Sequence, residues 1–74
     1  MAEGFVHSVW KDEQWVNELE LGGVVSGPHD SKEDAVERGR ELAMQRKTEH
    51  VIHNQDGEIA YRHSYGNDPV SSPG

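Results

Sequence analysis

The chain has no cysteine among its 74 residues. Disulfides, thiolate metal ligands and cysteine nucleophiles are therefore excluded. So is the disulfide framework with which small secreted domains often offset a thin core. The first ten residues, MAEGFVHSVW, lack the basic and apolar segments of a signal peptide, and no apolar run approaches the roughly 20 residues that span a bilayer. We therefore expect a soluble cytoplasmic protein with no membrane partner.

Basic residues are also scarce. Seven lysines and arginines stand against 14 acidic residues, which gives a formal net charge of −7. Phosphate backbones repel such a chain unless its basic residues cluster on one face. The arginines between residues 38 and 46 are interleaved with Glu33, Glu37 and Glu41, which is typical of a salt-bridged, exposed helix face. We therefore do not expect nucleic acid as the partner.

The N-terminal third predicts a β-hairpin in a single small domain. FVHSVW is rich in β-branched and aromatic residues, KDEQ suits a turn, and WVNELEL alternates apolar and polar positions. This register sets Trp10 opposite Trp15 and Val6 opposite Leu19. A short third strand at residues 24–25 is then expected to end at Gly27-Pro28.

The middle of the chain predicts a helix over about residues 32–47. Ser31 suits the N-cap, and Asp34 stands where it can reach back toward it. Small or apolar residues recur with the spacing of one helix face, at Ala35, Val36, Gly39, Leu42 and Ala43. Glycine in a helix interior costs about 1 kcal/mol relative to alanine. We therefore expect Gly39 to allow a close approach to the sheet, beneath a tryptophan ring.

A second hairpin follows, with strands at about residues 49–54 and 58–64. Residues 67–74 are too rich in glycine, proline and serine to bury a core and are predicted to be disordered, which leaves residues 1–66 as the domain. The predicted fold is α+β: a mainly antiparallel sheet of two hairpins with one helix on one face, in the order β-β-(β)-α-β-β.

Several stretches resemble the small prokaryotic family known as domain of unknown function 2188. The family pattern has a tryptophan in its second strand, a T/S-K-x-E-A helix start, a V-x-H-x-x-D-G-x-I hairpin and a closing S-Y-G-x-D-P. The corresponding stretches here are Trp15, Ser31-Lys32, VIHNQDGEI (51–59) and SYGNDP (64–69). This chain departs from the pattern at Asp34, and it is acidic where members are often basic. The resemblance implies the fold and size of the domain, with no established activity.

Three of the five histidines, His50, His53 and His63, lie on the second hairpin and are weak candidates for metal ligands. Zinc needs three or four converging ligands, and the chain has no HExxH motif and no histidine pair at helical spacing. We therefore expect no metal site.

The hairpin register decides which of these histidines meet. A turn over residues 54–57 with a G1 bulge at Gly57 pairs His53 with Ile59 and His50 with Arg62. A two-residue turn at Asp56-Gly57 would instead set His50 opposite His63. The residues of the turn favour the bulged form, and the second form remains the alternative.

No residue pattern predicts catalysis, since no serine stands in a nucleophile elbow and Gly22-Gly23 lacks the rest of a phosphate-binding loop. We expect a non-enzymatic, cofactor-free module that binds a protein partner or forms a homodimer. Phe5, Val9 and Val16 on the second face of the sheet are the candidate contact residues. The alternatives are a nucleic-acid-associated regulatory protein and a weak histidine-based metal binder.

Overall fold

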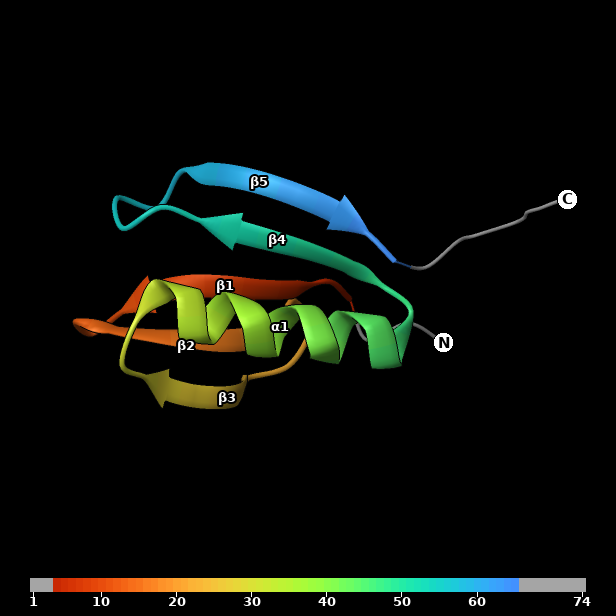
Figure 1. Ribbon diagram of the computed structural model, residues 1–74, viewed down its shortest axis with the longest axis horizontal. Coiled ribbons are helices and arrows are strands. Elements are labelled where there is room, and N and C mark those ends of the chain that lie inside the picture. The colour runs from red at the N-terminus through yellow and green to blue at the C-terminus, as the bar shows by residue number, and fades with distance from the viewer. Residues whose placement is uncertain (1–3, 66–74) are drawn as a thin grey trace, which may run out of the picture.

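One helix lies against one face of a five-stranded mixed sheet in the computed structural model, which describes residues 4–65 (Figure 1). The predicted α+β fold is therefore confirmed. The elements in chain order are β1 (Val6–Lys11), β2 (Gln14–Leu19), β3 (Val24–His29), α1 (Lys32–Arg46), β4 (Glu49–His53) and β5 (Ile59–Ser64). The sheet order is β3-β2-β1-β4-β5. β1 and β4 pair in parallel, and the other neighbours are antiparallel.

The first hairpin has the predicted register, with Trp10 opposite Trp15 and Val6 opposite Leu19. The two tryptophan rings meet edge to face, with centroids 5.4 Å apart. Asp12 and Glu13 form the turn, and both have positive φ, 53° and 64°. Two such residues between paired strands make the tight turn whose twist matches that of a hairpin.

The third strand is longer than predicted. β3 does not end at Gly27-Pro28 but runs through it to His29. β3 is an edge strand, and proline is tolerated on an edge strand because its missing N–H can face solvent instead of a neighbouring strand. Two register shifts in its pairing with β2 absorb the irregular backbone.

The helix begins where the sequence predicts. The Ser31 side chain accepts a hydrogen bond from the Asp34 backbone N–H at 3.1 Å, and Lys47 ends the helix in the left-handed conformation at φ 54°. The buried positions are Ala35, Gly39, Leu42 and Ala43. Gly39 does lie close to the sheet, but beneath it are polar side chains instead of the expected tryptophan ring. No helix within residues 4–65 is both long and apolar enough to span a membrane.

The second hairpin combines both registers that the sequence left open. Its turn is the predicted one, because the Gly57 N–H donates to the Asn54 carbonyl at 2.9 Å and Gly57 has φ 97°. The predicted pairing of His50 with Arg62 is nevertheless wrong. A bulge next to Ile52 makes Ala60 an extra residue, so that His50 pairs with His63.

The helix leaves one end of the sheet uncovered. α1 contacts β1, β2, β3 and β4, and no contact joins it to β5 within the described residues. Figure 1 shows β5 at the far edge, well clear of the helix. The core cluster is correspondingly small, with Val6, Leu42 and Ala43 buried against Leu19 and Tyr65. β5 is therefore the most solvent-exposed part of the sheet.

Candidate functional site

A chain of hydrogen-bonded polar side chains runs beneath the helix, and we call it the polar chain. Its members come from β1, β2, β3, β4 and the start of α1, and they are Ser8, Asn17, Ser26, His29, Asp34 and His50. Ser8 and Asn17 are fully buried, and His50 is only 2% exposed. A β-carbon on Gly39 would lie 2.5 to 2.7 Å from the polar atoms of these three side chains. Glycine is therefore what lets the helix close over the polar chain.

The hydrogen bonds of the buried half have a consistent direction. The Ser8 hydroxyl donates to Asn17 Oδ1 at 2.5 Å, so its oxygen accepts from His50 Nε2–H at 2.8 Å. Asn17 Nδ2 donates to the Ala35 carbonyl at 2.8 Å and to the Ser26 hydroxyl oxygen at 3.3 Å. Each buried polar group named here has a partner, which is the condition under which such a network stabilises a core.

The environment of His50 keeps its imidazole neutral. Burial is the main cause that lowers the pKa of His50 to about 4, and the nearby positive charges of Arg40, His63 and His7 act in the same direction. A neutral ring with its proton on Nε2 still provides the N–H that donates to Ser8. His50 therefore acts as a structural polar residue.

The other end of the polar chain brings a serine, a histidine and an aspartate together. Ser26 Oγ lies 2.5 Å from His29 Nε2, and His29 Nδ1 lies 2.9 Å from Asp34 Oδ2. This order of contacts matches a nucleophile, a base and an orienting carboxylate. The Ser26 oxygen, however, also accepts from Asn17, and Ser26 does not line the hollow beside His29.

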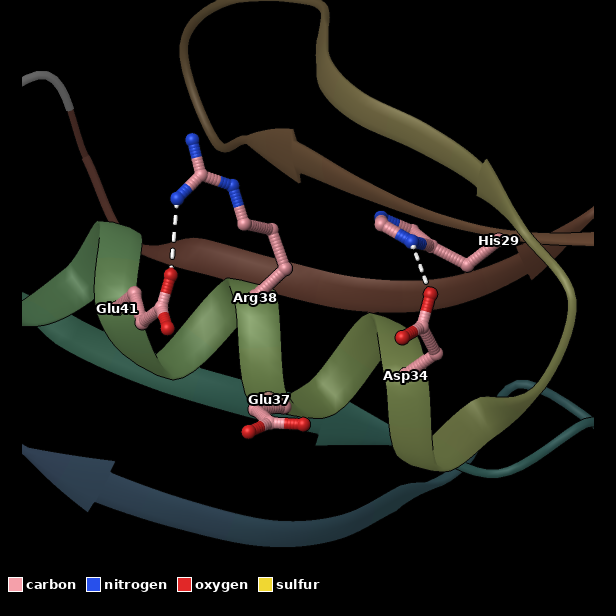
Figure 2. Close-up of a pocket in the computed structure, with 5 residues that line it drawn as sticks. All are labelled: His29, Asp34, Glu37, Arg38 and Glu41. Carbon is pink, nitrogen blue, oxygen red and sulfur yellow. Dashed lines mark hydrogen bonds and ion pairs between the residues drawn. The ribbon is translucent and has the colours of Figure 1, made fainter.

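The hollow beside His29 has a volume of about 220 Å³ and is shown in Figure 2. It is lined by His29, Asp34, Glu37, Arg38 and Glu41. Two contacts lie within it: Arg38 pairs with Glu41 at 2.9 Å, and His29 Nδ1 lies 2.9 Å from Asp34 Oδ2. The arginine of this hollow is therefore already paired with a carboxylate.

A second hollow, which we call the β5 groove, lies between α1 and β5 and has a volume of about 280 Å³. It is lined by Val36 and Arg40 of α1, by His50 and Ile52 of β4, and by Tyr61, His63 and Tyr65. The last three rings follow one another along one side: the centroids of Tyr61 and His63 are 6.2 Å apart, and those of His63 and Tyr65 are 4.5 Å apart. We call these three rings the aromatic row.

The three histidines considered as metal ligands do not converge. His50 and His63 face one another across β4 and β5, but His53 lies instead beside His7, with His7 Nδ1 2.9 Å from His53 Nε2. No group of three or more histidine, aspartate or glutamate residues that could hold a metal ion occurs in residues 4–65. The sequence did not indicate the His7–His53 pair, because it depends on the parallel pairing of β1 with β4.

The three candidate contact residues differ in exposure. Val16 is only 6% exposed, and Phe5 and Val9 are half-buried. Gly27 packs against Val16, since a β-carbon on Gly27 would lie 3.0 Å from Val16 Cγ1. Val16 therefore offers little surface to a partner in this structure.

Neither the polar chain nor the aromatic row could be predicted from the sequence, because both depend on how the strands pair. Ser8 and Asn17 were visible as polar residues in phase with apolar ones on their strands, and Gly39 was visible on an apolar helix face. These signals mark a buried polar contact only once the strands are placed under the helix. Tyr61, His63 and Tyr65 share one face because they alternate along the chain, but the bulge at Ala60 decides that this face is the one toward α1.

Comparison with known proteins identifies a family and no characterised relative. Residues 6–65 match the family described as "uncharacterized protein conserved in bacteria (DUF2188)". No curated protein matches the chain, and no solved structure does. The match spans every strand and the helix of the described residues, so this chain belongs to the domain of unknown function 2188 family.

Proposed function

We propose that this protein is a non-catalytic module that pairs with a second copy of itself through the free edge of β5. One observation carries this proposal. β5 forms one end of the sheet, and all six of its residues are exposed. They include two large apolar side chains, Ile59 and Tyr61, which are 54% and 57% exposed. An uncovered edge strand with exposed apolar side chains is a template for pairing with another chain.

The ladder between β4 and β5 indicates which backbone groups are free. The Tyr65 N–H donates to the Thr48 carbonyl at 3.2 Å, and hydrogen-bonded positions alternate along an antiparallel pair. The N–H groups of Tyr61 and His63 therefore point toward β4. Those of Arg62 and Ser64 point outward, where an antiparallel copy of β5 could accept them.

The other edge of the sheet suits pairing less well. β3 contains Pro28, which has no N–H to donate, and its backbone shifts register twice against β2. β5 has one bulge, at its start, and runs regularly from Tyr61 to Ser64. The homodimer is therefore assigned to β5.

Charge also permits two β5 strands to approach one another. The strand contains no acidic residue in a chain that carries −7. Its arginine is matched on the same subunit, since Arg62 Nε donates to Glu49 Oε2 at 2.5 Å. β5 therefore brings no acidic side chain of its own to the place where two acidic molecules would meet.

The hydrogen bonds of the histidine and serine side chains support the non-catalytic part of the proposal. The imidazoles of His29 and His50 are committed to hydrogen bonds within the polar chain. A half-buried serine with a second hydrogen bond is a poor nucleophile, since attack requires access to the oxygen. Support of this kind favours a binding module over a hydrolase.

Sedimentation velocity over a wide concentration range tests the homodimer. We expect a reversible dimer in the native chain and a monomer for Arg62→Pro, which removes an outward N–H without removing one from the β4 ladder. Arg62→Ala is the matched control, because it loses the same guanidinium but keeps the N–H, and it should still dimerise. Circular dichroism checks that each variant is folded.

A native chain that remains monomeric at every concentration would refute the proposal. Equal dimerisation of Arg62→Pro and Arg62→Ala would refute the assignment to the β5 edge. If Arg62→Pro does not fold, Ser64→Pro makes the same test at the next outward N–H, with Ser64→Ala as its control.

A further inference from the structure

We propose that the β5 groove binds a small anionic ligand with a planar ring, of the nucleoside monophosphate class. The base would lie on the aromatic row and the phosphate would pair with Arg40. The groove lies on the helix side of the sheet, whereas the proposed dimer uses backbone groups at the strand edge. This inference therefore does not depend on the homodimer.

The aromatic row supplies the surface for a ring. Tyr61 is 57% exposed, and its ring lies at 23° to that of His63, which in turn touches Tyr65. Aromatic side chains that follow one another on an exposed sheet face are the platforms on which bases stack in single-strand-binding proteins. α1 makes no contact with β5 within residues 4–65, so the rings of Tyr61 and His63 are open to solvent, while Tyr65 is half-buried at the edge of the core.

Arg40 supplies the positive charge. It lines the groove and is exposed, and no ion pair or side-chain hydrogen bond occupies it among residues 4–65. Its helix neighbour Arg38 is instead paired with Glu41. An arginine guanidinium with free donors is suited to a phosphate, which it can grip with two hydrogen bonds.

The electrostatic environment of the groove is opposite to that of the whole chain. None of the residues that line it is acidic, although the chain has 14 acidic residues. Arg40 also helps to lower the pKa of His50, after burial as the main cause, which places its positive charge near this groove. An anion is therefore drawn to this groove from an otherwise acidic surface.

Size and net charge favour a free nucleotide over a polymer. A volume of about 280 Å³ lies just below the usual range for ligand pockets, roughly 300–1,000 Å³, so only a small ligand fits. A polynucleotide would also bring many phosphates to a chain with a net charge of −7, at an electrostatic cost. A mononucleotide brings only the one phosphate that Arg40 can match.

Two-dimensional NMR of the full chain tests the proposal with adenosine 5′-monophosphate as the probe. We expect saturable shifts in the signals of Tyr61, His63, Tyr65 and Arg40. Adenosine lacks the anion and inorganic phosphate lacks the ring, so each should bind at least about ten-fold more weakly. Tyr61→Ala should weaken the mononucleotide about five-fold or more.

The matched pair of arginine variants makes the test specific. Arg40→Gln should weaken binding about ten-fold, whereas Arg38→Gln on the same helix should leave it unchanged. Both side chains are exposed, so both variants should fold. A mononucleotide that shifts no groove signal, or equal loss in the two variants, would overturn the proposal. If inorganic phosphate binds as tightly as the mononucleotide, the proposed contact between the base and the aromatic row is wrong. If a short single-stranded oligonucleotide binds more tightly per molecule, the proposal of a free nucleotide as the ligand is wrong.

Discussion

At the scale of single residues, the imidazole of His50 couples stability to pH. The folded protein holds the pKa of His50 near 4, below its unfolded value of about 6.5. The unfolded chain therefore takes up this proton first as the pH falls. The contribution of His50 to stability is complete above about pH 6.5 and is lost as the pH falls through about 4.

We expect this one group to lower the free energy of unfolding by about 3 kcal/mol between pH 7 and pH 4. Urea denaturation at a series of pH values measures the loss, and the His50→Gln variant, which has no imidazole there, should show a shallower pH dependence. His63→Gln, at an exposed position, is the control and should retain most of the native slope. Identical slopes in the native chain and His50→Gln would contradict this prediction.

Gly39 is the other residue on which the polar chain depends. A methyl group there would meet Asn17 Oδ1, His50 Nε2 and Ser8 Oγ at 2.5 to 2.7 Å, and these atoms are held by one another. Overpacking of this kind costs about 1–3 kcal/mol, which exceeds the gain of about 1 kcal/mol in helix propensity. We expect Gly39→Ala to lower the melting temperature by several degrees.

Thermal unfolding with Gly23→Ala as the matched control measures this effect. A β-carbon on Gly23 would have no atom within 4 Å, so that substitution should be neutral or should stabilise by about 0.4–1 kcal/mol through the unfolded chain. If Gly39→Ala proved as stable as Gly23→Ala, the close approach of α1 to the polar chain would be wrong.

At the scale of elements, the turn between β1 and β2 can be improved. Glu13 has φ 64°, a conformation that costs a residue with a β-carbon roughly 1 kcal/mol and costs glycine almost nothing. Glu13→Gly should therefore stabilise the protein by about 0.5–1 kcal/mol, measured by urea denaturation. Glu13→Ala removes the same carboxylate but keeps the β-carbon, so it should give no such gain. Equal stability of these two variants would exclude backbone strain as the cause.

In the second hairpin, the sequence predicts the turn correctly but not the pairing of the two strands. Residues 54–57 form the expected turn because Asn54 and Gly57 fit its backbone geometry. The bulge at Ala60 then shifts the pairing of every later β5 residue with β4 by one position. It thereby turns Tyr61 and His63 toward the side of the sheet that carries α1.

At the scale of the whole molecule, a small core makes association important. A domain of this length buries about 60% of its unfolded surface and has a narrow stability margin. If β5 pairs with a second copy, mass action stabilises the folded state as the protein concentration rises. The melting temperature of the native chain should then increase with concentration, and that of Arg62→Pro should not. Calorimetry at several concentrations measures this consequence of the proposed dimer.

The features that the sequence predicted correctly depend on residues close together in the chain. The register of the first hairpin follows from the alternation around Trp10 and Trp15. The start of α1 follows from Ser31, which accepts from the backbone three residues later. The family resemblance agrees with these elements and is confirmed over residues 6–65. The expected disorder of residues 67–74 falls outside the described residues and stays a prediction.

By itself, then, the sequence determined the order and type of the elements, since caps, turns and alternation act over a few residues. Only the tertiary structure decided what those elements enclose. Ser8, Asn17 and His50 come from three strands and meet because β1 pairs in parallel with β4 under a helix that carries glycine at position 39. His50 and His63 face one another because of a bulge that follows the turn. Contacts between residues distant in the sequence depend on how the strands are ordered and shifted, and no short stretch of residues specifies that order.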